Sequence, residues 1–279
     1  MAWHARDLID LNRYPIATPG PGRDAVLAAV RADLARDGCA VIKGFLTPEG
    51  VAALAAEAER VSGAGYRSES RTNAYFTKDD PSLPPDDPRR RFFDRSNAFI
   101  AADNFAEGGP LRSVYNAPGF DDFIRECLQA EDFYRYGDPL ADVIVNMAET
   151  GNGFPWHFDT NNFTVTLAIQ NADEGGCFEY APGIRDGDEN FAEVSRVLDG
   201  SSQAVRVLAL APGDLQLFRG RYSLHRVAPL KGGRRYVAIF SYVEEPDMVG
   251  APERTRQLYG RTLPIHHERA GRRGDRLID

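Results

Sequence analysis

The sequence is poor in cysteine and contains no long apolar run. Its three cysteines, Cys39, Cys127 and Cys177, lie far apart and form no CxxC spacing. This pattern disfavours a disulfide framework and a structural zinc site, and it is typical of a reducing compartment. No stretch approaches the length of a membrane span, and the first residues lack the basic segment and apolar stretch of a secretory signal. We therefore expect a cytoplasmic protein.

Basic residues are outnumbered by acidic ones. The chain of 279 residues has 33 Lys and Arg against 41 Asp and Glu, which gives a formal net charge of −8. Because phosphate binding needs a basic face, this balance argues against nucleic acid as a partner. Hydrophobic residues make up 43% and charged residues 27%, which is ordinary for a globular protein that can bury a full core.

The N-terminal part is predicted to begin with two helices around a short strand. Apolar residues recur at helical spacing over residues 24–37, and Gly38 ends this helix. The apolar segment CAVIKGF is the predicted strand. An alanine-rich helix is then expected from Pro48 to about Val61, with Thr47 as its N-cap, since a threonine oxygen can accept from a free N–H of the first turn.

Residues 63–118 are harder to assign because Gly, Pro, Asp and Arg are frequent there. Within them, DDPSLPPDDPRRR predicts a loop and FFDRSNAFI a strand. Residues 119–132 have the pattern of another helix. We therefore interpret residues 1–140 as a helical and irregular N-terminal addition.

The character of the chain changes at about Asp142. Short runs rich in β-branched and aromatic residues follow one another: DVIVNMAE, FTVTLAIQ, CFEYAP, AVRVLAL, DLQLF and RYVAIFSY. Turns such as GNG, DEGG, PGD and KGG separate them. Regularly spaced short strands favour a sandwich or barrel over an α/β sheet. We predict a single, mainly β domain over 1–279, with its core over 141–245 and a C-terminal extension over 246–279.

Three side chains of the β half form a candidate metal-binding set. In the segment WHFD, His157 and Asp159 point to one face of a strand and Phe158 to the other, because strand side chains alternate. A second histidine, His225, follows a strand in GDLQLFRGRYSLHRV. Two histidines and one carboxylate, with the other coordination positions open, are the ligands of non-haem Fe(II) oxygenases. A histidine in a β run is more often packed or hydrogen-bonded than a ligand, so the strand context is needed to favour the metal.

An arginine after the second histidine supplies another part of the site. The KGG turn leads into a strand that begins with Arg234 and Arg235. A guanidinium near a metal can bind the far carboxylate of a dicarboxylate cosubstrate through two hydrogen bonds, although a surface arginine paired with an acid is the plainer alternative. Only one of the two adjacent arginines can point inward. We favour Arg235, which shares a face with Val237 and Ile239, and Arg234 stays the alternative.

These segments together resemble the Fe(II)/2-oxoglutarate-dependent dioxygenase superfamily. The resemblance rests on His157-x-Asp159, His225 and Arg235, with GGCFEYAP and APGDLQLF between them, and covers roughly residues 142–243. It implies a double-stranded β-helix, that is, a cupin-like jelly roll. It also implies Fe(II), 2-oxoglutarate and O₂ as requirements, with succinate and CO₂ as co-products.

A looser resemblance concerns the branch of this superfamily that hydroxylates or chlorinates free amino acids such as lysine. It rests on HFDTNNFTVTLAIQ and GGCFEYAP. In the halogenating members a small residue replaces the carboxylate ligand and opens a site for chloride. Asp159 is present here, so the resemblance implies hydroxylation of an unactivated C–H bond in a small polar substrate, with a free amino acid favoured. The alternatives are a protein or lipid substrate, or a non-catalytic, metal-binding cupin-like sensor.

Five further residues are candidates for binding the cosubstrate or the substrate. Asn146, in the strand DVIVNMAE, is expected to bind 2-oxoglutarate, with a satisfied core polar group as the alternative. Trp156 and Asn161 flank the metal ligands and are candidates for the substrate pocket. Arg95 and Asn97, in FFDRSNAF, are candidates because an arginine can bind a substrate carboxylate; an internal salt bridge of Arg95 is the alternative.

The predicted enzyme is expected to act on a small molecule. Neither nucleic acid nor a membrane is expected as a partner, since the charge balance argues against the first and the lack of long apolar runs against the second. A homodimer is an open alternative for the assembly.

Overall fold

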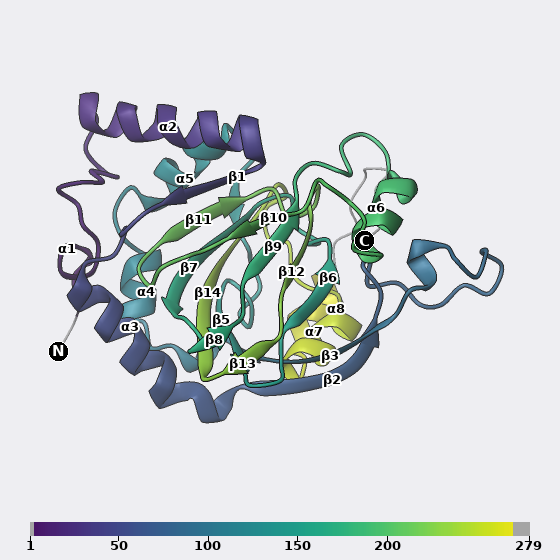
Figure 1. Cartoon of the computed structure of the whole chain (residues 1–279). Helices are drawn as coiled ribbons and strands as arrows, with labels where there is room; N and C mark the ends of the chain where they lie inside the picture. Colours follow the sequence, from purple (N-terminus) through teal and green to yellow (C-terminus); the bar gives the residue numbers. More distant parts are fainter. Residues whose placement is uncertain (1–2, 270–279) are drawn as a thin grey trace.

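Two antiparallel β-sheets lie face to face at the centre of the molecule (Figure 1). The computed structural model describes residues 3–269. The larger sheet has eight strands in the order β1-β11-β7-β14-β5-β3-β2, with β4 paired to the end of β14. The smaller sheet has four strands in the order β10-β9-β12-β6, and β13 and β8 form a two-stranded ribbon. The mainly β architecture predicted from the short apolar runs is therefore confirmed.

The strands have the following bounds. The larger sheet contains Cys39–Ile42 (β1), Tyr66–Thr72 (β2), Phe93–Ile100 (β3), Tyr134–Arg135 (β4), Val143–Glu149 (β5), Thr164–Gln170 (β7), Leu215–Phe218 (β11) and Arg234–Val243 (β14). The smaller sheet and the ribbon contain Phe154–His157 (β6), Glu174–Gly175 (β8), Phe178–Ala181 (β9), Arg206–Leu208 (β10), Leu224–Val227 (β12) and Leu230–Gly232 (β13).

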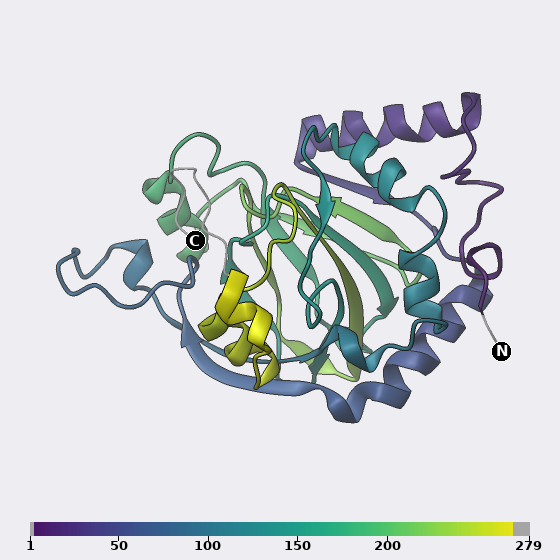
Figure 2. The same cartoon turned by 180° about the vertical axis from the view of Figure 1, so that it is seen from behind.

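Helices cover the outer face of the larger sheet, as the view from behind shows (Figure 2). This layer is made of Pro21–Asp37 (α2), Pro48–Val61 (α3), Pro110–Tyr115 (α4) and Phe120–Leu128 (α5), with the short Ala5–Leu8 (α1) beside α3. Pro252–Tyr259 (α7) lies against β2 and β3, and Pro264–Arg269 (α8) contacts α7. Phe191–Leu198 (α6) follows β9. The remaining helical turns are the 3-10 segments Ser62–Ala64, Pro88–Arg90 and Ala102–Asn104.

Strand alternation decides which side chains face the helices and which face the space between the sheets. On β14, Tyr236, Phe240 and Tyr242 belong to the main hydrophobic core shared with the helical layer. Phe240 stacks on Tyr115 with a ring-centre distance of 5.4 Å and meets Phe120 edge-on at 5.4 Å. The intervening residues of β14 point the opposite way, toward the smaller sheet. Burial of the aromatic side chains therefore fixes the direction of the alternate residues of β14, which include Arg235.

Several predicted elements agree with the structure and others do not. The predicted helix from Pro48 to Val61 is confirmed, and the Thr47 oxygen accepts from the Gly50 N–H at 2.9 Å. The helix expected over 24–37 starts earlier, since Pro21 suits a first helical position. The helix expected over 119–132 stops at Leu128 because the next residue adopts a left-handed conformation.

The first 140 residues contribute strands as well as helices. The predicted strand in FFDRSNAFI is β3, while β2 was not predicted because its sequence, YRSESRT, is polar. Both strands extend the larger sheet beyond β5. In the C-terminal extension predicted over 246–279, residues 252–259 and 264–269 are helical, and residues 270–279 lie outside the described residues.

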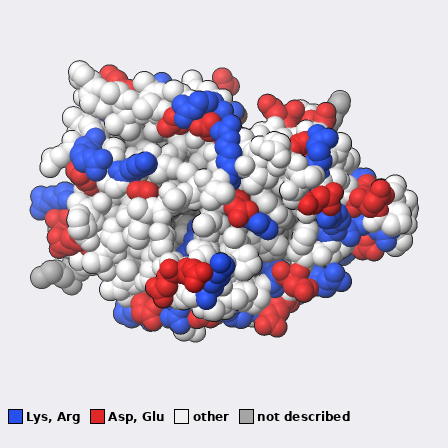
Figure 3. Space-filling view, viewed as in Figure 1, with Lys and Arg blue, Asp and Glu red and all other residues white. Residues whose placement is uncertain are grey.

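The face of the molecule drawn in Figure 3 carries charged side chains of both signs, which are interspersed. Over residues 3–269, none of the helices combines the length and the apolar character needed to cross a membrane.

The aromatic contact between β14 and the helical layer can be tested by truncation. Phe240→Ala should lower the free energy of unfolding by about 3–5 kcal/mol, because it removes a fully buried ring and leaves a cavity. Urea unfolding measures the change. Val207→Ala is the matched control: Val207 is 66% exposed, so its truncation should change stability by less than about 0.5 kcal/mol. Equal stability losses in the two variants would contradict this packing.

Candidate metal centre

Two histidines lie directly opposite each other on paired strands of the smaller sheet. His157 ends β6, His225 lies on β12, and the register of the two strands pairs these residues. Their ring centres are 4.1 Å apart, and both side chains are buried. Phe154 stacks on the His157 ring at a ring-centre distance of 3.8 Å. The pairing of β6 with β12 thus brings together two residues that are far apart in the sequence.

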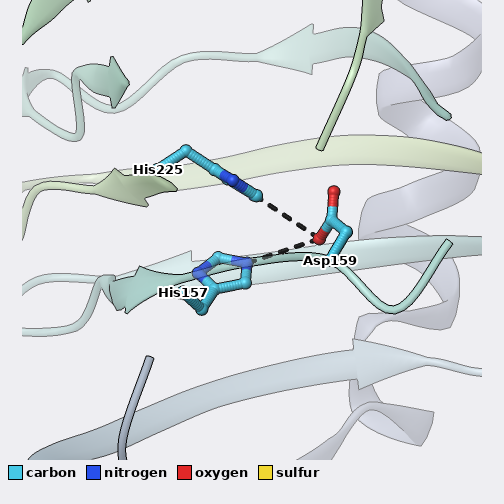
Figure 4. A group of neighbouring side chains, drawn as sticks. All are labelled: His157, Asp159 and His225. Atoms are coloured by element: carbon cyan, nitrogen blue, oxygen red, sulfur yellow. Dashed lines mark ion pairs between the residues drawn. The ribbon is translucent and has the colours of Figure 1, made fainter. Parts of the chain in front are cut away.

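The carboxylate of Asp159 completes the group (Figure 4). Its Oδ1 lies 3.5 Å from Nε2 of His157 and 3.4 Å from Nε2 of His225. The other oxygen, Oδ2, accepts a hydrogen bond from the Thr164 hydroxyl on β7. One potential ligand atom from each of the three residues lies within 4.8 Å of the others. The predicted set His157, Asp159 and His225 therefore converges on one point.

The hydrogen bonds of the imidazoles show that each Nδ1 carries a proton. Nδ1 of His157 is 2.8 Å from the carbonyl oxygen of Pro155, and Nδ1 of His225 is 2.9 Å from that of Ser223. Because a carbonyl oxygen only accepts, each Nδ1 donates, and Nε2 of a neutral ring keeps its lone pair. Burial, reinforced by the neighbouring His225, lowers the pKa of His157 to about 4, so His157 is neutral near pH 7.

The two Nε2 atoms thus lie about 3.5 Å from one carboxylate oxygen. When both rings are neutral, these three atoms are acceptors that repel one another, and a cation at their centre removes that repulsion. Nitrogen and oxygen donors in a set of two histidines and one carboxylate suit Fe(II), with the remaining coordination positions open. The residues present therefore fit an iron ion.

The carboxylate of Asp159 occupies space that a side chain at position 220 would fill. The Asp159 N–H donates to the carbonyl of Gly220 at 3.1 Å. A Cβ atom added to Gly220 would lie 1.9 Å from Asp159 Oδ2 and 2.9 Å from the Thr164 hydroxyl oxygen. Glycine at position 220 is therefore required for the carboxylate to occupy its place beside the histidines.

The two adjacent arginines of β14 have different surroundings. Arg234 lies at the surface, with Nη2 2.8 Å from Glu149 Oε1 and Nη1 3.0 Å from Glu59 Oε1. Arg235 is 7% exposed, faces the space between the sheets, and makes no hydrogen bond or ion pair with any described residue. Burial lowers the pKa of Arg235 to about 10, which leaves it charged near pH 7.

Several other buried side-chain N–H groups also have no hydrogen-bond acceptor among the described residues. Asn146 on β5 is opposite Val237 of β14, and its Nδ2 is buried without a partner among the described residues. Arg95 donates from Nε to the side-chain oxygen of Asn97 at 2.8 Å, but its two Nη atoms and Asn97 Nδ2 have no partner in that same part of the chain. The internal salt bridge considered as an alternative for Arg95 is not formed there.

A cavity of about 160 Å³ borders the metal ligands. His157, Asp159 and Asn161 line it, together with the aromatic residues Phe76 and Phe154. It adjoins a cavity of about 700 Å³, and both are lined by Phe76, Tyr136, Thr160, Asn161, Gly250 and Arg254. The predicted Asn161 thus lies beside the metal ligands, on the path from the outer cavity.

The structure places Trp156 elsewhere. Because it precedes His157 on β6, its ring points to the opposite face and packs with Phe158 in a separate hydrophobic cluster. Together with Arg95 it lines a third cavity, of about 680 Å³, which contains neither of the two histidines. Trp156 and Asn161 are therefore not brought together, although both flank the ligand motif in the sequence.

Sequence reasoning missed three residues of the site. Gly220 and Thr164 position Asp159, and Arg254 of α7 lines both of the connected cavities. The sequence around Arg254, PERTRQLY, is typical of a solvated helix and gives no signal of a buried role. The contacts of Gly220 and Thr164 depend on tertiary structure, so only the proximity of Thr164 to the H-x-D motif could have suggested it.

Solved structures with the same arrangement of strands are known. AviO1 from Streptomyces viridochromogenes Tue57 is 20% identical, with 84% of this chain and 100% of that chain covered and a TM-score of 0.54. A prolyl hydroxylase from Trichoplax adhaerens, solved in complex with a peptide fragment of hypoxia inducible factor, is 16% identical, with 80% and 91% covered and a TM-score of 0.55. A 2OG-Fe(II) oxygenase family oxidoreductase from Burkholderia pseudomallei is 14% identical, with 82% and 93% covered and a TM-score of 0.52. At these identities the likeness establishes the fold, which is the predicted jelly roll.

Fold and metal-binding set together define an Fe(II)- and 2-oxoglutarate-dependent oxygenase. Within that class, the family model HalD, described as Halogenase D, matches residues 23–258, and the chain belongs to this family. No curated protein matches the sequence.

The tight fit around Asp159 can be tested at Gly220. Gly220→Ala should push the carboxylate away from the two histidines and weaken metal binding by at least about tenfold, since displaced ligands lose affinity. Titration with Mn(II), followed by electron paramagnetic resonance, measures the affinity. Gly108→Ala is the control, because an added Cβ there meets nothing within 4 Å. An unchanged affinity in Gly220→Ala would show that Asp159 is not held as described.

Proposed function

We propose that this oxygenase hydroxylates an unactivated C–H bond of a small polar substrate, with a free amino acid as the favoured class. The observation that carries the proposal is the carboxylate of Asp159, which occupies the third ligand position beside His157 and His225. Halogenating relatives in the branch that this sequence resembles have a small residue there and bind chloride in the space. Here Asp159 fills that space, which supports hydroxylation although the family is described as Halogenase D.

His157, Asp159 and His225 would hold Fe(II) and leave positions open for 2-oxoglutarate and O₂. Iron with these two reactants supplies the oxidation of an unreactive C–H bond and yields succinate and CO₂. The protein itself positions the reactants and excludes water. The hydrogen bonds from Nδ1 of His157 and His225 to the Pro155 and Ser223 carbonyls hold both imidazole rings with Nε2 directed at the metal position.

Arg235 would bind the far carboxylate of 2-oxoglutarate. Its support is a buried guanidinium with no partner, on the face of β14 that looks toward the histidines. A buried cation without an acid is costly, and a carboxylate that accepts two hydrogen bonds relieves the cost. Asn146, whose side-chain N–H group is also unpaired, would donate to the same cosubstrate.

The substrate would reach the metal through the two connected cavities. The inner volume of about 160 Å³ supports a small molecule rather than a folded protein segment. Asn161 lies along this path. Arg95 and Asn97 have unpaired buried donors for polar groups of the substrate. Arg95 lines the third cavity together with Trp156, so these two residues would contact the substrate only from that cavity.

Turnover of 2-oxoglutarate tests the proposal. Wild-type protein with Fe(II), ascorbate and 2-oxoglutarate should form succinate, and a panel of free amino acids should contain one that gains a single oxygen. Asp159→Ala should lose hydroxylation, because the ligand and its charge are removed. Glu174→Ala, which changes an exposed carboxylate in the ribbon, is the control and should retain it. Hydroxylation by Asp159→Ala at the wild-type rate would exclude Asp159 as a ligand, and chlorinated product from the wild type would favour halogenation.

The assignment of the cosubstrate carboxylate is tested by two neighbouring variants. Arg235→Gln should raise the 2-oxoglutarate concentration for half-maximal succinate formation by about tenfold or more, because a charge-assisted, bidentate contact is lost. Arg234→Gln, in which only surface ion pairs are removed, should stay within about threefold of wild type. The reverse order of effects would assign the role to Arg234.

A further inference from the structure

Arg254 brings a cation to the wall of the inner cavity. It comes from α7 and lines the cavity with His157 and Asp159. Nη1 donates to Gln257 Oε1 at 2.7 Å, and the guanidinium carbon lies 4.0 Å from the ring centre of Phe76. Arg254 forms no ion pair with any carboxylate of residues 3–269. The guanidinium is thus supported by a ring and an amide, and part of its hydrogen-bonding capacity stays available to the cavity.

The carboxylates that line the inner cavity with Arg254 interact mainly with other groups. Asp159 interacts with Arg254 electrostatically, but its charge would be shared with the metal. Asp138 also lines the cavity, where it accepts from the N–H groups of Leu140 at 2.8 Å and Gly250 at 3.0 Å and lies 3.0 Å from Nε2 of His266. These contacts use the lone pairs of Asp138, so the cavity offers an uncompensated cation and no available carboxylate for an ammonium group.

The acids of the outer cavity are likewise paired. Asp79 lies 2.9 Å from Nε of Arg90, and Glu253 lies 4.0 Å from the ammonium group of Lys78. The charge of Asp79 is therefore compensated by Arg90, whereas Glu253 is exposed at the rim, where water screens its charge. An incoming substrate meets the charge of Arg254 as it passes from the outer to the inner cavity.

A second guanidinium increases the positive potential near Arg254. The guanidinium carbon of Arg95 lies 6.0 Å from the ring centre of Phe76, the ring that Arg254 also contacts. Burial, and then the charge of Arg254, lower the pKa of Arg95 well below its usual value. Both Nη atoms of Arg95 are buried and have no partner among the described residues. Both guanidinium groups lie beside the Phe76 ring, and an anion held near that ring would reduce the repulsion between them.

We propose that Arg254 binds a carboxylate of the substrate beside the metal, so that the enzyme selects carboxylic acids at this position and rejects ammonium groups. This inference rests on the proposed function and narrows its substrate class. A free amino acid would enter with a carboxylate toward Arg254. A cationic side chain such as that of lysine would find no acid to pair with in the inner cavity.

A small fluorinated carboxylate can be used to test whether a carboxylate binds beside Arg254 and the metal, although the natural substrate is not identified. The protein is loaded with Mn(II) and saturating 2-oxoglutarate without O₂, and the ¹⁹F relaxation of trifluoroacetate is measured. Relaxation by a paramagnetic ion falls steeply with distance, so only a probe held near the metal is affected. We expect a metal-dependent enhancement in wild type, a reduction of at least about tenfold in Arg254→Gln, and partial recovery in Arg254→Lys. The cation 3,3,3-trifluoropropylammonium should show little enhancement.

Arg256→Gln is the matched control, since it changes an exposed arginine of the same helix and should behave as wild type. An equal enhancement in wild type and Arg254→Gln, or a stronger effect for the ammonium probe, would overturn the role of Arg254. If wild type binds Mn(II) and 2-oxoglutarate but shows no enhancement, this inference alone fails. If electron paramagnetic resonance shows that Mn(II) does not bind, the metal site fails and the inference with it.

Discussion

Two imidazole nitrogens and a carboxylate oxygen lie close together beside the inner cavity, and the rest of the site follows from this electrostatic constraint. Because Nδ1 of His157 and of His225 donate to backbone carbonyls, Nε2 is the atom of each neutral ring that carries the lone pair. Both nitrogens lie about 3.5 Å from the same oxygen of Asp159. In a buried place water does not screen the repulsion among these groups. A divalent cation turns the repulsion into coordination, and the protein has kept positions free for the other ligands of iron.

The fold holds the three acceptors by pairing and close packing. The register of β6 and β12 sets the two histidines opposite each other, and the strand partners of β12 and β6 leave them little freedom. Asp159 lies just beyond β6, where the Gly220 carbonyl and the Thr164 hydroxyl fix its backbone and side chain. On the facing sheet, the aromatic row of β14 packs against helices, and Arg235 is therefore turned inward. The same jelly roll thus places the proposed metal ligands at one sheet and the proposed cosubstrate-binding cation, Arg235, on the other.

Much of this could be predicted from the sequence because it depends on local alternation. The H-x-D spacing predicted that His157 and Asp159 share one face of a strand; β6 ends at His157, but Asp159, just beyond it, still meets the histidines. The adjacency of Arg234 and Arg235 means that only one can point inward. Arg254 and Gly220 could not be predicted, because each acts through contacts between segments that are distant in the chain. The polar strand β2 was missed for a related reason: its hydrogen bonds to β3 stabilise it, whereas its own residues give no apolar pattern.

Crystals soaked with Mn(II) and 2-oxoglutarate without O₂, measured at the manganese absorption edge, test the central claim most directly. We expect one anomalous peak, from an ion bound by Nε2 of His157, Nε2 of His225 and a carboxylate oxygen of Asp159. We also expect 2-oxoglutarate to chelate this ion and to contact Arg235 through its far carboxylate. A metal bound at another place, or a fourth protein ligand that closes the open positions, would contradict this claim.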